Sequence, residues 1–228
     1  MNNTDKDKNL WLVFCILTIL VIIGTAAFLA SSKTTKLELS LIEGEKIDVK
    51  LFRILPHNIS LKFIFNINGR DSRPELGEYK TVGNWRETGI LKFENPGEPI
   101  KLLLSNTNQD VIYETMPISG TGATTVSRNL IIYKEDNNPS KFSWPPSADV
   151  QYSLDSGINE FQITVLEVGK QLVGEKVSLW IKPPLGFKSY VSSYSFLWYF
   201  FLWPLYTFIL LVLFILLFIR KRRRRIAK

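Results

Sequence analysis

Cysteine and histidine are almost absent from this sequence, which has 228 residues, one Cys and one His. A disulfide framework needs paired cysteines, and a zinc ribbon needs three or four nitrogen or sulfur ligands. The sequence therefore excludes both as means of stabilising the fold, and it predicts no metal and no cofactor. The single cysteine, Cys15, lies in a long apolar run with no base beside it, which favours a packing residue over a nucleophile.

The motifs that usually carry catalysis are missing as well. His57 lies in a Leu-Pro-His-Asn turn, and no Gly-x-Ser-x-Gly element supplies a nucleophile that it could activate. The glycine-rich run 119–125 lacks Gly-Lys-Ser/Thr and is followed by a strand pattern, so it predicts a hairpin connection and not a phosphate loop. The acidic residues could supply a pair of catalytic carboxylates, as in glycoside hydrolysis, but solvated positions on a sheet explain them more simply.

Two long apolar runs dominate the two ends of the chain. Residues 10–30 are 21 residues without a charge, and residues 196–219 are another 24. About 20 apolar residues in a helix cross the hydrocarbon core of a bilayer, so both runs predict transmembrane helices. Cleavage of the first as a signal peptide is the alternative, with Thr25 and Ala27 at the cleavage positions. The charges before the run cancel, and the run is longer than the apolar region of a typical signal peptide. Both features favour a retained anchor.

The basic tail predicts the orientation of the second helix. Its charges would stay on the cytoplasmic side, and only Lys182 and Lys188 lie close before the helix. Aromatic residues gather at the other end of the helix, as in an interfacial belt. The topology signal is Arg220, Lys221, Arg222, Arg223, Arg224 and Arg225, and the membrane-interface residues are Tyr194, Trp198, Tyr199 and Trp203. Both termini are therefore predicted to be cytoplasmic.

The net charge of +7 does not indicate nucleic-acid binding. Between the spans, 28 − 2 − 7 = 19 basic residues face 21 − 2 = 19 acidic residues, so the whole excess lies in the tail. A nucleic-acid surface would need clustered surplus cations in the folded domain. We therefore expect no nucleic-acid partner, and we expect the tail to meet the lipid bilayer.

The segment between the spans alternates apolar and polar residues, which is the pattern of half-buried strands. The longest alternating run, 59–67, carries Ile, Leu, Phe, Phe and Ile at every second position. About ten such strands, separated by turn signals, predict a mainly β domain: an antiparallel β-sandwich of the immunoglobulin-like or jelly-roll kind. The predicted organisation is a cytoplasmic N-terminus 1–9, a transmembrane helix 10–30, a β-sandwich domain 31–195, a second helix 196–219 and a basic tail 220–228.

Two long polar stretches, 68–88 and 134–149, interrupt the strand pattern. Loops of this length in a compact domain are usually functional or mobile, and the exposed tryptophans of the domain could bind a partner or stack on a sugar. Trp180 alternates with Leu179 and Ile181, so it should lie on the opposite face of the sheet. The candidate contact residues are Trp85, Trp144, Trp180, Asp71, Glu75 and Glu78.

Three functions are compatible with these features. The first is a non-enzymatic accessory or assembly subunit of a membrane protein complex, whose helices dock with partner helices while the β-domain binds a protein outside the cytoplasm. The second is a membrane-tethered module that binds an envelope glycan or lipid, and the third is a carboxylate-dependent hydrolase. The first is favoured. The lack of cysteine in the exported part indicates a bacterial inner membrane with a periplasmic domain.

Overall fold

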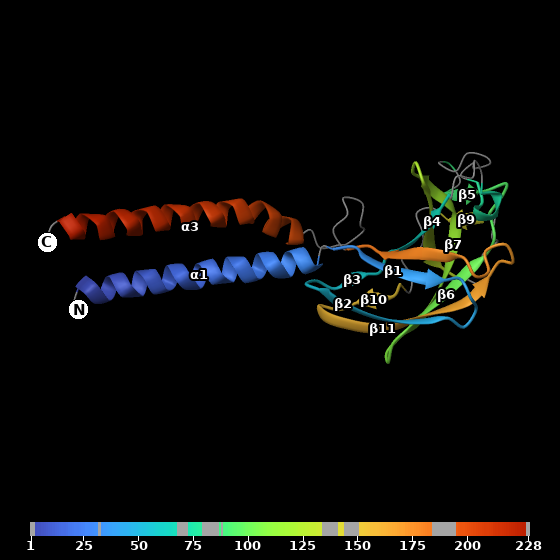
Figure 1. Cartoon of the computed structure of the whole chain (residues 1–228), viewed down its shortest axis with the longest axis horizontal. Coiled ribbons are helices and arrows are strands. Elements are labelled where there is room, and N and C mark those ends of the chain that lie inside the picture. The colour runs from blue at the N-terminus through green and yellow to red at the C-terminus, as the bar shows by residue number, and fades with distance from the viewer. Residues whose placement is uncertain are drawn as a thin grey trace. The chain divides into compact units, whose positions relative to one another are not determined.

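The structure is a computed structural model, and its chain divides into two compact units. The first unit combines residues 1–31 with residues 190–228, and the second comprises residues 32–189. Figure 1 shows both units. The described residues are 3–31, 33–67, 73–78, 87, 89–133, 141–143, 151–183 and 195–226.

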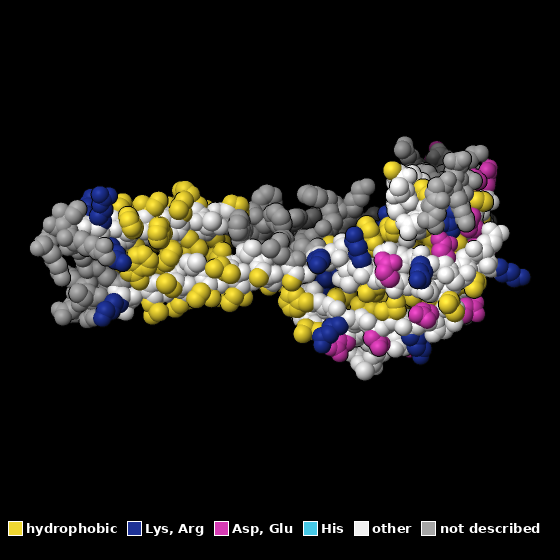
Figure 2. Space-filling model, in the orientation of Figure 1, with side chains coloured by type: hydrophobic (Ala, Val, Ile, Leu, Met, Phe, Trp, Pro, Cys, Tyr) yellow, Lys and Arg dark blue, Asp and Glu magenta, His cyan; other side chains and the backbone are white. Residues whose placement is uncertain are grey.

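Two long helices make up the first unit. Helix α1 spans Asn3–Ser31 and helix α3 spans Ser195–Ile226. Each contains a 20-residue segment that is long enough and apolar enough to cross a membrane. The segments are Lys8–Ala27 in α1 and Pro204–Arg223 in α3. Apolar side chains are exposed along both helices, as Figure 2 shows, and neither has the polar face of a helix on a soluble core. The predicted pair of apolar terminal helices is confirmed.

An aromatic cluster joins the two helices. The indole ring of Trp11 meets Phe14 at 5.8 Å and Phe214 at 6.3 Å between ring centroids, both edge to face. The Lys221 ammonium lies 5.8 Å from the centre of the same indole. Because Trp11 is near the start of α1 and Phe214 and Lys221 are in the last half of α3, the helices run antiparallel (Figure 1).

The second unit is built on one antiparallel sheet of eight strands. Each strand pairs with its neighbours in the order β1-β12-β4-β8-β7-β6-β11-β2. The strands are β1 (Thr35–Ser40), β2 (Lys46–Arg53), β4 (Leu61–Asn66), β6 (Ile100–Ser105), β7 (Asp110–Thr121), β8 (Thr125–Ile132), β11 (Gly157–Val168) and β12 (Lys176–Ile181). Two short pairs accompany the sheet: β3 (His57–Asn58) with β10 (Ser153–Leu154), and β5 (Ile90–Lys92) with β9 (Lys141–Ser143).

The sheet is nearly closed, because its two edge strands, β1 and β2, are consecutive in the chain. Residues 41–45 connect them and are held by backbone hydrogen bonds of 2.9 Å, from the Leu41 amide to Glu175 and from the Gly44 amide to Val165. The prediction of a mainly antiparallel β domain is confirmed. The hydrogen bonds join these eight strands into a single sheet. The finer prediction, a sandwich of two separate sheets, is therefore not confirmed.

The alternation of apolar and polar residues in the sequence corresponds to the two faces of this sheet. Apolar residues lie mainly on its inner face, and polar residues lie mainly on its outer face. In β4, Leu61, Phe63 and Phe65 are fully buried, and the residues between them face outward. The other strands contribute alternate residues in the same way, among them Leu102 of β6 and Leu179 of β12. One continuous apolar core therefore fills the sheet.

Strand β7 departs from regular pairing at a bulge. Its register with β8 shifts between Thr115 and Ile118, and Pro117 lies inside this irregular stretch. Proline cannot donate a ladder hydrogen bond, so a bulge is where a strand can accept it. Beside the bulge, Met116 packs with Phe93 in a small second apolar cluster.

The sheet has two ends, which we call the near end and the far end. The near end carries Thr35 and Ile181, where the chain enters and leaves the sheet, and these two residues are paired. The far end carries Ser40 and Lys176, which are also paired.

Replacing Phe63 by Ala should lower the free energy of unfolding by about 3–5 kcal/mol, because a fully buried ring is removed from the core. Phe52 is the matched control, since its ring is 37% exposed on β2, and Phe52→Ala should cost about 1 kcal/mol or less. Urea unfolding of the full chain in detergent, followed by near-UV circular dichroism, measures both. Equal losses would contradict the assigned core.

Candidate functional site

Trp180 lies on the outer face of the sheet, one residue from the near end. Its neighbours Leu179 and Ile181 point into the core, and the indole is only partly covered, as the alternation predicts. The indole Nε1–H donates to the Ser178 hydroxyl at 3.0 Å. A large aromatic ring with its polar atom satisfied is thus presented to the outside.

Lysines flank this tryptophan on both neighbouring strands. Lys36 of β1 and Lys62 of β4 are each in register with Trp180 of β12. The Lys36 ammonium lies 4.5 Å from the centre of the indole ring, a cation–π contact. Lys182, one residue beyond β12, donates its amide to the carbonyl of Ser60 at 2.9 Å. We call Lys36, Lys62, Trp180 and Lys182 the outer basic patch.

The charges of the outer basic patch are crowded. The pKa of Lys182 is lowered by burial and, in addition, by the positive charge of Lys62. Ion pairs within the described residues occupy other lysines, such as Lys50 with Glu160 and Lys101 with Glu167, and none includes Lys36, Lys62 or Lys182. The patch is therefore a group of cations that would gain from an added anion.

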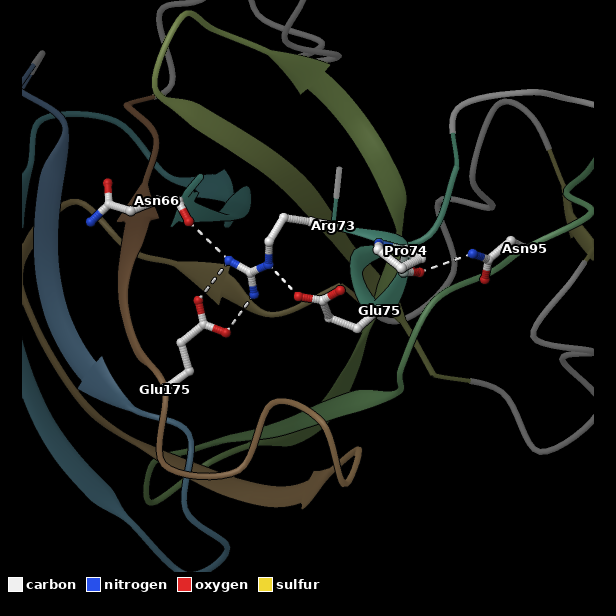
Figure 3. Close-up of polar contacts among 6 residues, drawn as sticks. All are labelled: Asn66, Arg73, Pro74, Glu75, Asn95 and Glu175. Carbon is white, nitrogen blue, oxygen red and sulfur yellow. Dashed lines mark hydrogen bonds and ion pairs between the residues drawn. The ribbon is translucent and has the colours of Figure 1, made fainter. Parts of the chain in front are cut away.

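A second polar cluster lies at the far end and surrounds Arg73, as Figure 3 shows. The Arg73 guanidinium donates to both carboxylate oxygens of Glu175, at 3.0 and 2.7 Å, and to the Asn66 carbonyl at 2.8 Å. Its Nε pairs with Glu75. The Arg73 side chain is 4% exposed. Burial alone would lower the pKa of Arg73, but the two carboxylates outweigh it and raise the pKa.

The segment that carries Arg73 is docked against residues 95–98. A short 3-10 helix, Pro74–Leu76, buries Leu76 completely. The Glu98 amide donates to the Glu75 carbonyl at 2.7 Å, and the Asn95 side-chain amide donates to the Pro74 carbonyl at 2.9 Å (Figure 3).

Glycine is required where the two segments meet. Gly97 has φ +75°, and a Cβ there would lie 2.5 Å from the Leu76 carbonyl carbon. The close contact at Gly97 and the hydrogen bonds of Asn95 and Glu98 together hold the segment 73–78 against residues 95–98.

Arg128 is a second buried cation, and backbone carbonyls hold it. Within β8 it occupies the inward position between Val126 and Leu130. It donates to the carbonyls of Met116 at 2.7 Å, Glu98 at 2.7 Å and Pro96 at 3.3 Å. Burial lowers the pKa of Arg128 to about 9, against a smaller opposing effect of Glu98. Its side chain joins the β7 bulge to the segment that also supports Arg73.

His57 is buried at the near end, close to Arg53. Its Nδ1 lies 3.2 Å from the Leu55 carbonyl, and its Nε2 has no hydrogen-bond partner among the described residues. The pKa of His57 is lowered by burial and, to a smaller extent, by the charge of Arg53, while the bond with Leu55 opposes both. Burial in this arrangement favours the neutral imidazole over the charged one.

Among the candidate contact residues that the structure describes, Trp180 lies apart from Glu75. Trp180 lies in the outer basic patch, Glu75 is paired with Arg73, and Glu78 is exposed and donates its amide to the Asn95 carbonyl. Outside the described residues are Asp71, Trp85, Trp144 and Tyr194.

Apart from Tyr194, the proposed interface and topology residues belong to α3. Among them, Arg220, Lys221, Arg222 and Arg223 are exposed near its end. Helix α3 also includes Trp198, Tyr199, Trp203, Arg224 and Arg225, whose side chains are outside the description.

Sequence analysis missed the cations that organise the domain. Arg128 had a visible signal, since it interrupts an alternating apolar run at an inward position. Lys36 and Lys62 had none, because only the strand register places them beside Trp180.

Comparison with known proteins identifies no family. No family model matches the chain, and no curated protein does. A crystal structure of a protein from Sulfurospirillum deleyianum is similar, with 17% sequence identity and a TM-score of 0.39. The match covers 66% of this chain and 97% of that chain. At this level the similarity indicates neither a shared family nor a function.

Replacing Glu175 by Gln should lower the free energy of unfolding by about 2–3 kcal/mol, because it leaves the buried Arg73 with one carboxylate. The exposed pair Lys50–Glu160 is the control, since its side chains are 67% and 65% exposed. Glu160→Gln should change stability by less than about 1 kcal/mol. Chemical denaturation of both variants measures the difference, and similar losses would show that the Arg73 pair contributes no more than a surface pair.

Acidification below about pH 6.5 should destabilise the domain through His57, because the unfolded chain binds a proton that the folded domain resists. The His57 contribution is complete above pH 6.5 and is lost as the pH falls. The difference in unfolding free energy between wild type and His57→Gln should therefore shrink between about pH 7 and pH 5. Parallel curves for the two proteins over this range would rule out the effect, since carboxylates titrate alike in both.

Proposed function

We propose that this protein is a non-catalytic accessory or assembly subunit of a membrane protein complex, anchored by α1 and α3. The observation that carries the proposal is the pair of apolar helices at the two ends of a β-domain, with apolar side chains exposed along both. Such surfaces need lipid or partner helices around them. A domain whose chain is anchored in the membrane both before its first strand and after its last strand is suited to presenting a fixed surface to a neighbour.

The antiparallel helix pair supports the predicted topology. Contact between Trp11 and Lys221 brings the start of α1 to the end of α3, so both termini would lie on one side of the membrane. The basic residues that end α3 favour the cytoplasmic side for both. The β-domain would then face outward, which in a bacterial inner membrane is the periplasm.

An exposed apolar surface at the far end supports a protein partner. Ile42, Leu166 and Val173 are exposed there, on segments that backbone hydrogen bonds hold side by side. The Gly174 amide donates to the Leu41 carbonyl at 2.8 Å, and the Gly44 amide donates to Val165 at 2.9 Å. We call Ile42, Leu166 and Val173 the far-end apolar patch. Neighbouring exposed apolar residues are a usual feature of protein interfaces.

Purification of the full chain from its native membrane in mild detergent tests this proposal. The expected result is a stoichiometric membrane protein, identified by mass spectrometry. Because a buried aspartate without a partner is costly in an interface, the double variant Ile42→Asp/Val173→Asp should lose that protein. The control Ile158→Asp changes an exposed isoleucine at the near end, and it should keep the partner. Wild-type protein that purifies alone and monodisperse would overturn the proposal.

A further inference from the structure

The outer basic patch has the composition of a surface for anionic headgroups. The Lys36 ammonium lies over the partly exposed indole of Trp180, and Lys62 is in register with Trp180 on the other neighbouring strand. Lys182 lies close enough to Lys62 for the charge of Lys62 to lower its pKa. We propose that this patch binds the phosphate groups of anionic phospholipids in the bilayer that holds α1 and α3. The inference rests on the membrane anchoring in the proposed function and does not depend on a protein partner.

The length of the connection to α1 supports a lipid as the ligand. Helix α1 ends at Ser31 and β1 begins at Thr35, so Lys36 follows the helix by five residues. A fully extended chain spans at most about 3.6 Å per residue, which limits this connection to about 18 Å. A patch on so short a tether cannot move far from the lipid headgroups if α1 crosses the bilayer.

The electrostatics of the patch favour an added phosphate. Each lysine near an anionic membrane surface contributes about 1 kcal/mol to binding, and three lysines lie together here. Burial lowers the pKa of Lys182 and the charge of Lys62 lowers it further, so these two cations are close enough to repel each other. Phosphate groups between them would remove this repulsion. Tryptophan is also the residue type that accumulates at the level of lipid headgroups.

The cation–π contact argues against a sugar as the ligand of this patch. Lys36 already covers one face of the Trp180 indole, so that face cannot stack on a sugar ring. The groups left to bind are ammonium ions, whose natural partners are phosphate oxygens. The Trp180 ring then positions Lys36 within the row.

The basic end of α3 requires a measurement that resolves single residues. Its exposed arginines and lysine would be expected to bind anionic lipid in any simple vesicle assay and so to mask the contribution of the patch. Reactivity of individual lysines avoids this difficulty. An ammonium that binds phosphate is both shielded and held protonated, so it reacts more slowly with an amine-labelling reagent.

The full chain is reconstituted in nanodiscs of phosphatidylcholine, with and without phosphatidylglycerol, and its lysines are labelled at low ionic strength. We expect phosphatidylglycerol to slow the labelling of Lys36, Lys62 and Lys182 about fivefold, the ratio equivalent to about 1 kcal/mol per lysine. The exposed Lys46 and Lys176, at the far end, should react at unchanged rates. Equal rates at Lys182 in the two bilayers would overturn the inference, as would slowing of all five lysines alike.

A matched pair of variants tests the geometry of the patch. Lys36→Gln/Lys62→Gln should abolish the protection of Lys182, whereas Lys46→Gln/Lys176→Gln removes the same charge and should retain it. Protection of Lys182 by inorganic phosphate in pure phosphatidylcholine, with none from phosphatidylglycerol, would assign the patch to a free anion and overturn the lipid source. Carbonate extraction of native membranes tests anchoring separately: a chain that stays in the membrane but shows no protection refutes the patch alone.

Discussion

The far end of the sheet depends on satisfying the charge of Arg73 in a site that water barely reaches. Removing a cation from water costs several kcal/mol unless carboxylates and carbonyls replace the lost solvation. Glu175, Glu75 and the Asn66 carbonyl do so, and they come from three separate parts of the chain. Residues 95–98, docked against the same segment, then accept hydrogen bonds from Arg128. Two buried cations thus hold together connections that apolar packing alone would leave undefined.

The two ends of the domain have different chemistry. Exposed apolar side chains on tight turns mark the far end, and a row of cations with an aromatic ring marks the outer face toward the near end. The proposals assign these surfaces to different neighbours, a protein and the lipid headgroups. With both surfaces occupied, the lipid headgroups would orient the domain at its near end, and the protein partner would bind it at its far end.

The sequence predicted what depends on local pattern. The apolar run 196–219 lies within α3, and the inward positions of Phe63 and the outward position of Trp180 follow from alternation. Contacts between distant residues were not predictable. The pair Arg73–Glu175 joins residues 102 apart, and the row of Lys36, Trp180 and Lys62 exists only through strand register. Near closure of the sheet depends on the same long-range pairing, which a single sequence does not specify.

The pairing of β1 with β12 also sets the order in which the domain can fold. Residues 35–40 pair with residues 176–181, so the first strand of the domain has its partner only when the last strand exists. β2 likewise waits for β11, and unpaired strand edges tend to associate with other chains. Because a ribosome delivers the chain from its N-terminus, this sheet cannot be complete before residue 181 has been delivered. The exposed edges of an unfinished domain would need protection until residue 181 has emerged.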